Sequence, residues 1–223
     1  MNTQISYPAG SMSACRGPGA PGEAVRAPLV LKPLVGVARD RGLELIRRRF
    51  QQEHQAHLTH FMPRLLGLVD AAGGLAGAAG CRPAAGETLF LERYVDLPIE
   101  QAIAAVAGEP VARHEVVEVG NLAAESPGCA RVLIVALTAW LASQGYRWVA
   151  FTGTRSLLNS FHRLGLAPRV LAPADPARMG DALPQWGRYY AQQPQVVFGE
   201  IPPAQRLLSQ SVGAPAWWTQ EGV

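Results

Sequence analysis

The stretch over residues 114–166 constrains the fold of this chain more than any other. Residues 114–123 are rich in Val and Leu with polar residues among them, and residues 130–144 are almost wholly apolar. A short second apolar run follows Arg147 and extends to Phe151, and a helical pattern closes on Gly165. These periodicities predict a strand, a long buried helix, a second strand and a shorter helix. Alternating strands and helices are typical of the α/β layered class. We therefore predict a sheet that carries helices on both faces.

The size and composition of the chain indicate one principal domain. With 223 residues, 48% of them hydrophobic, the chain can bury one substantial core. Residues 1–34 are rich in Pro, Gly, Ala and Ser, so we expect a disordered N-terminal tail, a domain over 35–203 and a C-terminal tail over 204–223. The net charge is +3, and all of the basic residues except Lys32 are arginines, which are scattered along the sequence. They do not form the clustered basic patch that a nucleic-acid-binding surface needs.

Cysteine usage and hydropathy favour a cytoplasmic protein. Cys15, Cys81 and Cys129 are too irregularly spaced for a metal site and cannot all pair, which fits a reducing compartment. The N-terminus lacks the basic and apolar regions of a signal peptide, and the apolar run over 132–142 is far shorter than the ~20 residues that span a bilayer. We expect no transmembrane segment, which leaves peripheral membrane contact open.

The remaining elements are predicted from local patterns. They are a helix over 41–58 capped by Asp40, a hairpin over 64–70 and 75–82, a helix from Pro98 to Gly108, and strands over 169–171 and 195–201. His54, His57 and His60 follow one another at three-residue steps, which spread around a helix, so we predict no metal site. The small residues over 75–80 allow either a ligand or tight packing.

A turn at residues 125–130, Glu-Ser-Pro-Gly-Cys-Ala, carries the first chemical signal. It leads from the predicted strand into the long helix, where unpaired N–H groups and the helix dipole suit a phosphate. The alternative is that Pro127 and Gly128 merely turn the chain.

The motif Glu125-x-x-Gly128-x-Ala130 resembles the acyl-donor loop of the GNAT acyltransferase superfamily, and Phe161-x-x-x-Gly165-Leu166 resembles its Tyr-x-x-x-Gly-Phe close. LFLERYVDLPIEQAI, VEVGNLA, LLNSFHRLGL and WGRYY together resemble the bacterial thermostable hemolysin family. The resemblance implies a GNAT-like mixed, mostly antiparallel twisted sheet. It also implies an N-acyltransferase without a permanently bound cofactor, which takes an acyl-phosphopantetheine donor, on acyl carrier protein or acyl-CoA, and a small-molecule amine acceptor.

The resemblance assigns donor contacts to the end of the first strand, the loop, and the second strand with its helix. They are Leu122, Ala123, Ser126, Gly128, Cys129, Ala130, Arg131, Thr152 and Asn159. Glu125 adds a negative charge and Pro127 removes an N–H, so the loop suits the single phosphate of a carrier-bound phosphopantetheine better than coenzyme A. The inserted segment 89–108 and the small residues over 75–80 suggest space for a long acyl chain.

The strand over 114–123 also holds the candidate catalytic residues. Glu118 is the predicted general base for the amine, and the alternative is that it pairs with an arginine such as Arg113. Gly120 permits a bulge that directs N–H groups near Asn121 and Leu122 toward the thioester carbonyl. We expect this strand and the strand over 147–151 to splay apart around the pantetheine arm. Phe161 replaces the tyrosine acid of the family and cannot donate a proton.

The hemolysin resemblance raises a second function, that of a membrane-perturbing protein without acyltransferase chemistry. A pore former needs a membrane-length segment, a barrel alternation or a strongly amphipathic helix. The sequence shows none of these, which favours the acyltransferase.

Overall fold

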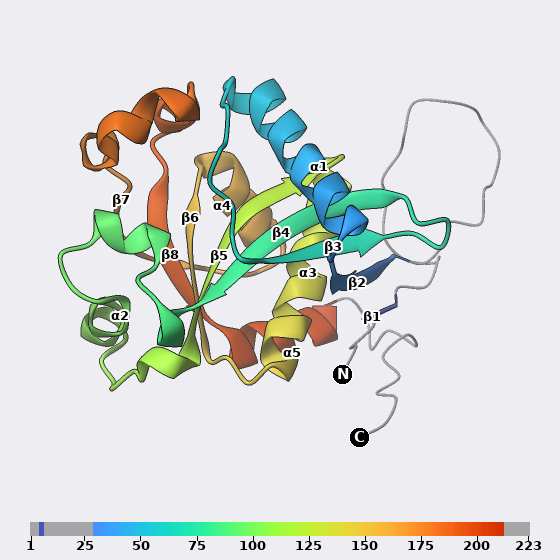
Figure 1. The fold of residues 1–223 in the computed structure, drawn as a ribbon. Coiled ribbons are helices and arrows are strands. Elements are labelled where there is room, and N and C mark those ends of the chain that lie inside the picture. The colour runs from blue at the N-terminus through green and yellow to red at the C-terminus, as the bar shows by residue number, and fades with distance from the viewer. Residues whose placement is uncertain (1–4, 7–28, 212–223) are drawn as a thin grey trace.

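A computed structural model describes residues 5–6 and 29–211 of the chain (Figure 1). Its strands are β1 (Ile5–Ser6), β2 (Val30–Pro33), β3 (Arg64–Val69), β4 (Leu75–Pro83), β5 (Val116–Ala124), β6 (Trp148–Gly153), β7 (Arg169–Pro173) and β8 (Gln195–Glu200). Its α-helices are α1 (Val37–His54), α2 (Ile99–Ala107), α3 (Pro127–Ser143), α4 (Arg155–Arg163) and α5 (Ile201–Ser211). Short 3-10 helices are η1 (Ala84–Gly86), η2 (Phe90–Tyr94), η3 (Arg113–Glu115), η4 (Pro176–Trp186) and η5 (Tyr189–Gln192).

The strands form one mixed sheet in the order β1-β2-β3-β4-β5-β6-β8-β7. Neighbouring strands are antiparallel except β5 and β6, which are parallel and joined by α3. Helix α1 covers one face of the sheet, whereas α3 and α5 lie on the other (Figure 1). The predicted fold class is therefore confirmed, and so is the central strand–helix–strand–helix unit, which is β5-α3-β6-α4.

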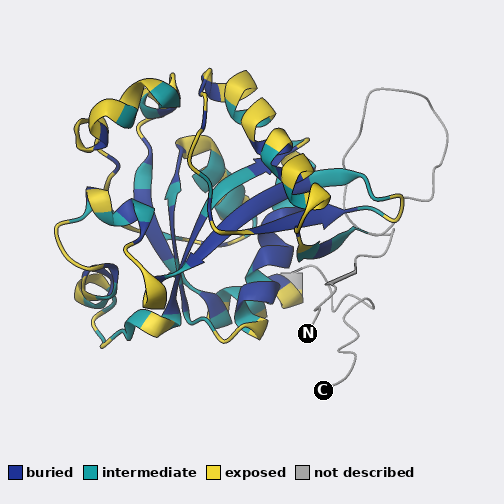
Figure 2. Ribbon diagram, in the orientation of Figure 1, coloured by how far each residue is buried: buried dark blue, intermediate teal, exposed yellow. Residues whose placement is uncertain are grey.

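Helix α3 owes its central position to its composition. Its almost wholly apolar sequence packs against the sheet on one side and against α4 and α5 on the other (Figure 2). A helix that is apolar on most sides is stable only when it is covered on most sides. Two further apolar clusters fill the opposite face of the sheet, one beneath α1 and one beneath η2 and α2.

Both expected domain boundaries need correction where the structure describes them. Residues 30–33, assigned to the tail, form β2, and Leu31 is fully buried in the sheet. At the other end α5 extends to Ser211, and Leu208 is only 2% exposed. Pro202 and Pro203 begin this helix rather than end the fold, because the first helical residues need no N–H donor. Residues 1–4, 7–28 and 212–223 of the expected tails lie outside the described residues.

The first helix also differs from its prediction. It begins at Val37 after Gly36, not after Asp40, and it ends at His54, where Gln55 adopts a left-handed conformation with φ 56°. Asp40 therefore lies inside the first turn, where its negative charge still opposes the positive end of the helix dipole.

Strands β5 and β6 pair only along half of the longer strand. Residues Val116–Val119 pair with Trp148–Phe151, whereas Gly120–Ala124 has no partner on β6. The predicted separation of these two strands is confirmed, and it places an opening in the middle of the sheet.

Candidate active site

A β-bulge lies where β5 leaves β6. Gly80 of β4 pairs with Gly120 of β5 and Ala78 pairs with Ala123, so β5 carries one extra residue between the two pairs. Asn121 absorbs the bulge with a φ of 52°, a conformation that Asn tolerates better than most residues. Its Oδ1 accepts the Met62 N–H at 2.8 Å. The predicted bulge is confirmed, and the Asn121 side chain holds the loop before β3.

The small residues over 75–80 serve packing, not ligand contact. A Cβ on Gly80 would lie 2.4 Å from the Met62 side chain, and one on Gly77 would lie 3.2 Å from Leu133 of α3. None of these small residues lines the main cavity of the described chain. Of the two alternatives in the sequence, tight packing is the correct one.

The main cavity has a volume of about 500 Å³ and passes through the sheet at the separation of β5 and β6. Val119 belongs to the core beneath α3, whereas Val116 belongs to the core beneath η2. Because side chains alternate along a strand, Glu118 points to the η2 face. The cavity is lined by residues from both faces, so it connects them.

One end of the cavity, which we name the apolar arm, lies between the sheet and helices α3, α4 and α5. Its lining side chains are Ile134, Leu137, Leu141, Val149, Phe151, Leu157, Phe161 and Ile201. Phe161 stacks on Phe151 with ring centroids 4.7 Å apart. The side chain that replaces the tyrosine acid of the GNAT resemblance is therefore part of an apolar ring pair.

The other end, which we name the ring-lined arm, lies between α1, η2 and η5. Its lining side chains include Phe50, His54, His60, Phe90, Tyr94, Trp186 and Tyr189. Sequence reasoning missed the contribution of Trp186, Tyr189 and Gln192, although WGRYY carries part of the family resemblance. The inserted segment 89–108 contributes Phe90 and Tyr94 to this arm, on the Glu118 face of the sheet. It does not line the apolar arm, so its suggested role in making space for a long acyl chain there is not met.

Glu118 lies at the junction of the two arms and is only 2% exposed. Its Oε2 accepts the Phe90 N–H at 2.8 Å and its Oε1 accepts the Leu91 N–H at 3.0 Å. Burial disfavours the charged form and raises the pKa of Glu118 to about 7, against the opposing effect of these two N–H groups and of Arg82. The carboxyl group therefore changes charge near neutral pH, as a general base requires.

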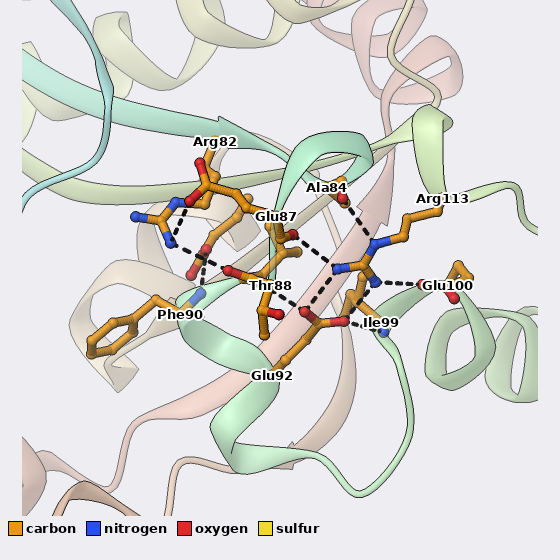
Figure 3. Close-up of polar contacts among 11 residues, drawn as sticks. Arg82, Ala84, Glu87, Thr88, Phe90, Glu92, Ile99, Glu100 and Arg113 are labelled. Carbon is orange, nitrogen blue, oxygen red and sulfur yellow. Dashed lines mark hydrogen bonds and ion pairs between the residues drawn. The ribbon is translucent and has the colours of Figure 1, made fainter.

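Arg113, the example given as an alternative partner, does not bind Glu118. Arg113 binds Glu92 and Glu100, each at 2.7 Å, and not Glu118 (Figure 3). Arg82 of β4 lies opposite Glu118 in the strand register, and its positive charge lowers the pKa of Glu118. Arg82 in turn approaches Glu87 at 3.7 Å.

The N-terminus of α3 differs from the predicted turn. The helix begins at Pro127, and the Ser126 hydroxyl caps it by accepting the Cys129 N–H at 3.2 Å. Pro127 has no N–H, so Gly128 supplies the first available donor of this turn. Glu125 pairs with Arg48 of α1 at 2.5 Å, which offsets the negative charge that the sequence placed beside the loop.

The predicted site residues divide into two groups. Those that line the cavity are Glu118, Asn121, Leu122, Ser126, Ala130 and Thr152. Those that lie outside its lining are Ala123, Gly128, Cys129, Arg131 and Asn159. Ala123 packs beneath α1, and Asn159 is exposed on α4. Strand alternation explains why Ala123 does not line the cavity: the side chains of its neighbours Leu122 and Ala124 face the opening, and its own side chain points away from it.

The three histidines also divide. His54 is buried, lines the ring-lined arm and lies 3.2 Å from the Gln192 amide, and burial lowers its pKa. His60 lines the same arm and lies 3.3 Å from a nitrogen of Arg82. His57 is exposed and outside this cavity. Among the described residues no group of three His, Cys, Asp or Glu side chains is placed to hold a metal ion.

The pKa of Glu118 predicts a pH dependence of stability. Folding raises this pKa from 4.5 to about 7, so the folded state binds the proton more tightly than the unfolded state. The stabilisation is complete below pH 4.5 and is lost as the pH rises through 7, by about 3 kcal/mol in all. We expect the free energy of unfolding of the wild type minus that of Glu118→Gln, measured by denaturant titration, to fall as the pH rises from 4.5 through 7. A difference that is independent of pH would contradict the buried, proton-binding carboxyl.

Several solved structures share this fold. An N-acyl amino acid synthase from uncultured soil microbes, FeeM, aligns with a TM-score of 0.54 at 16% identity, over 83% of this chain and 99% of that one. The AHL synthase LasI aligns with a TM-score of 0.55 at 9% identity, over 87% and 99% of the two chains. TofI in an apo form aligns with a TM-score of 0.52 at 17% identity, over 80% and 94%. These likenesses show that the chain shares its fold with an N-acyl amino acid synthase and an AHL synthase.

The sequence comparisons complete the assignment. No curated protein matches the chain. No helix among the described residues is long and apolar enough to cross a membrane. The sequence pattern of the family described as thermostable hemolysin matches residues 37–205, from the start of α1 into α5, so the chain belongs to the thermostable hemolysin family.

Proposed function

We propose that this chain is an N-acyltransferase that moves a long fatty acyl group from a phosphopantetheine thioester to a small-molecule amine. One observation carries the proposal: a single cavity crosses the sheet at the separation of β5 and β6 and joins an apolar arm to a ring-lined arm, with a buried carboxyl at the junction. The proteins of similar fold support it, because they include an N-acyl amino acid synthase, whose named product carries an acyl group on nitrogen, and an AHL synthase.

The two arms divide the substrates between the two faces of the sheet. The pantetheine arm lies between β5 and β6 beyond Val119, and its phosphate lies near Ser126 and Gly128 at the start of α3. The acyl chain fills the apolar arm beneath α3. The amine enters through the ring-lined arm, which brings it to Glu118.

The reaction needs one proton to be removed and one leaving group to depart. The amine nitrogen attacks the thioester carbonyl carbon, and the Glu118 carboxylate accepts a proton from that nitrogen directly or through a water molecule. The N–H groups of the bulge around Asn121 and Leu122 stabilise the oxyanion. The C–N bond forms and the C–S bond breaks, releasing a thiolate that needs no enzymic acid, because a thiol pKa near 8.5 makes it a tolerable leaving group.

The donor is an acyl carrier protein rather than coenzyme A. The first turn of α3 uses the Cys129 N–H for its own cap and lacks one at Pro127, so few donors remain for a pyrophosphate. A carrier-bound phosphopantetheine has one phosphate and depends less on this turn.

Donor competition tests the proposal. We expect the thiol to be released only when both an amine and a thioester are present. We expect a dodecanoyl carrier protein to be the best donor, dodecanoyl-coenzyme A to be a weaker one and acetyl-coenzyme A to be the weakest. Each buried methylene contributes about 0.8 kcal/mol, or about fourfold in kcat/KM. A thiol reagent follows the reaction with a panel of tyramine, hexylamine and amino acids. Equal or better use of acetyl-coenzyme A would exclude the long-chain donor.

A vesicle assay separates this proposal from direct membrane damage. Purified protein without donor or acceptor is expected to leave dye inside vesicles of phosphatidylcholine and phosphatidylglycerol. Dye release by the protein alone, undiminished in Glu118→Gln, would instead support the membrane-perturbing function.

A further inference from the structure

We propose that Arg113 and Glu92 are positioning residues for Glu118: they hold η2 so that its first N–H groups meet the Glu118 carboxyl group. The inference rests on the proposed function only in giving Glu118 the role of base. Neither Arg113 nor Glu92 lines the cavity, so any effect they have on the reaction must pass through another group.

The Glu118 carboxyl group depends on η2 for its hydrogen bonds to the backbone. Both of its oxygens accept backbone N–H groups, from Phe90 and from Leu91, the first two residues of η2. A five-residue 3-10 helix has little internal hydrogen bonding with which to fix its own position. Its place relative to β5 must therefore be set by contacts from outside.

Glu92 supplies the first of these contacts. Its Oε2 accepts the Leu89 N–H at 2.7 Å, at the start of η2, and its Oε1 accepts the Ile99 N–H at 2.8 Å, at the start of α2. The carboxylate thus joins the beginnings of two successive helices (Figure 3). Leu89 directly precedes the residue whose N–H binds Glu118, so a displacement of Leu89 also displaces that donor.

Arg113 fixes Glu92 and the loop around it. Two of its nitrogens bind the two oxygens of Glu92 at 2.7 and 2.9 Å, and Nη1 also binds Glu100 at 2.7 Å. Nε donates to the Ala84 carbonyl at 2.8 Å, and Nη2 donates to the Glu87 carbonyl at 3.0 Å. These five hydrogen bonds match the five N–H donors of a guanidinium. Lysine has only three donors and cannot replace it.

The groups that face Glu118 allow the positioning effect to be separated from a direct effect of charge. They are Arg82 on β4, and Glu92 and Tyr94 on η2. His54 and His60 line the same cavity. The N–H groups of Phe90 and Leu91 lower the pKa of Glu118 more than the negative charge of Glu92 raises it. Removing the Glu92 charge alone would therefore lower this pKa, whereas loosening η2 would raise it.

Titration of Glu118 by NMR, with ¹³C in the glutamate side-chain carboxyl, tests this without any need for activity. We expect Glu92→Gln and Arg113→Met to raise the Glu118 midpoint by about one pH unit, a tenfold change in proton affinity, and Arg113→Lys by less. Arg147→Met is the matched control, because Arg147 also pairs with two glutamates, Glu109 and Glu200, but touches neither η2 nor the cavity. Its midpoint should equal that of the wild type.

The outcomes are distinct. A Glu118 midpoint that is unchanged or lowered in folded Glu92→Gln overturns the proposal, whatever the activity of the variant. If Arg113→Met fails to fold, Glu92→Gln and Arg113→Lys carry the test. A raised midpoint in a protein that transfers no acyl group supports the positioning of Glu118 but contradicts the proposed function. In an active enzyme, the acid limb of the pH–rate profile should move with the midpoint, so that turnover of Glu92→Gln falls about tenfold at pH 6 and recovers at high pH.

Discussion

Replacement of Glu118 by glutamine is expected to lower kcat by about 10²-fold or more while the fold is kept. Glutamine cannot accept the amine proton, and the wild-type carboxyl, with a pKa of about 7, is suited to doing so at neutral pH. The measurement is amide formation across pH 5–9. In the wild type the rate should rise to half its maximum near pH 7, and this limb should be absent from the residual activity of Glu118→Gln.

Glu109→Gln is the matched control for this experiment. Glu109 carries the same carboxyl group, but it pairs with Arg147 and lies outside the cavity lining. Its rate should be near that of the wild type. A Glu118→Gln rate that is unchanged at every pH would move the role of base elsewhere. His54 would then be the next candidate, because it is buried in the ring-lined arm, whereas His57 lies outside this cavity.

Replacement of Val149 by phenylalanine is expected to shorten the acyl chain that the enzyme accepts. Val149 lies two residues before the end of the β5–β6 pairing and lines the apolar arm beneath α3. A larger side chain there displaces about three methylenes of a dodecanoyl chain, which lowers kcat/KM by on the order of 50-fold at about 0.8 kcal/mol each. Acetyl or butanoyl donors should be affected little. The measurement is kcat/KM over a series of donors of increasing chain length.

The matched control is Val170→Phe, the same substitution at an exposed position on β7, 47% exposed and outside the cavity. Its chain-length profile should equal that of the wild type. Equal losses for short and long donors in Val149→Phe would mean that the acyl chain does not occupy the apolar arm.

Elements with strong periodicity could be predicted from the sequence, and so could the opening in the sheet. Local patterns predict the β5-α3-β6-α4 unit, the hairpin of β3 and β4, and the bulge near Gly120, because each is determined by its own residues. Helix α5 was not predicted, because Pro202 and Pro203 are typical of a stop. Whether a proline ends one element or begins another depends on the residues after it, and here a buried Leu208 anchors a helix.

The site was predictable along β5 but not across the fold. Glu118 could be identified from its strand and its place before the bulge, yet its partners on η2 are 27 and 28 residues distant in sequence, and its supposed partner Arg113 binds elsewhere. Trp186 and Tyr189 reach the cavity from a still more distant segment. Backbone N–H donors leave no mark on side-chain identity, so no pattern in the sequence could have assigned those of Phe90 and Leu91 to Glu118.

Mass spectrometry of lipid extracts tests the central claim most directly. Cells that produce the wild-type chain, cells that produce Glu118→Gln and cells that produce neither are compared under the same conditions. We predict an amide-linked fatty acyl product in the first extract that is absent or reduced by about 10²-fold in the second. Three indistinguishable extracts, with both proteins present in folded form, together with no amine-dependent thiol release by the purified wild type, would contradict the assignment of this chain as an N-acyltransferase.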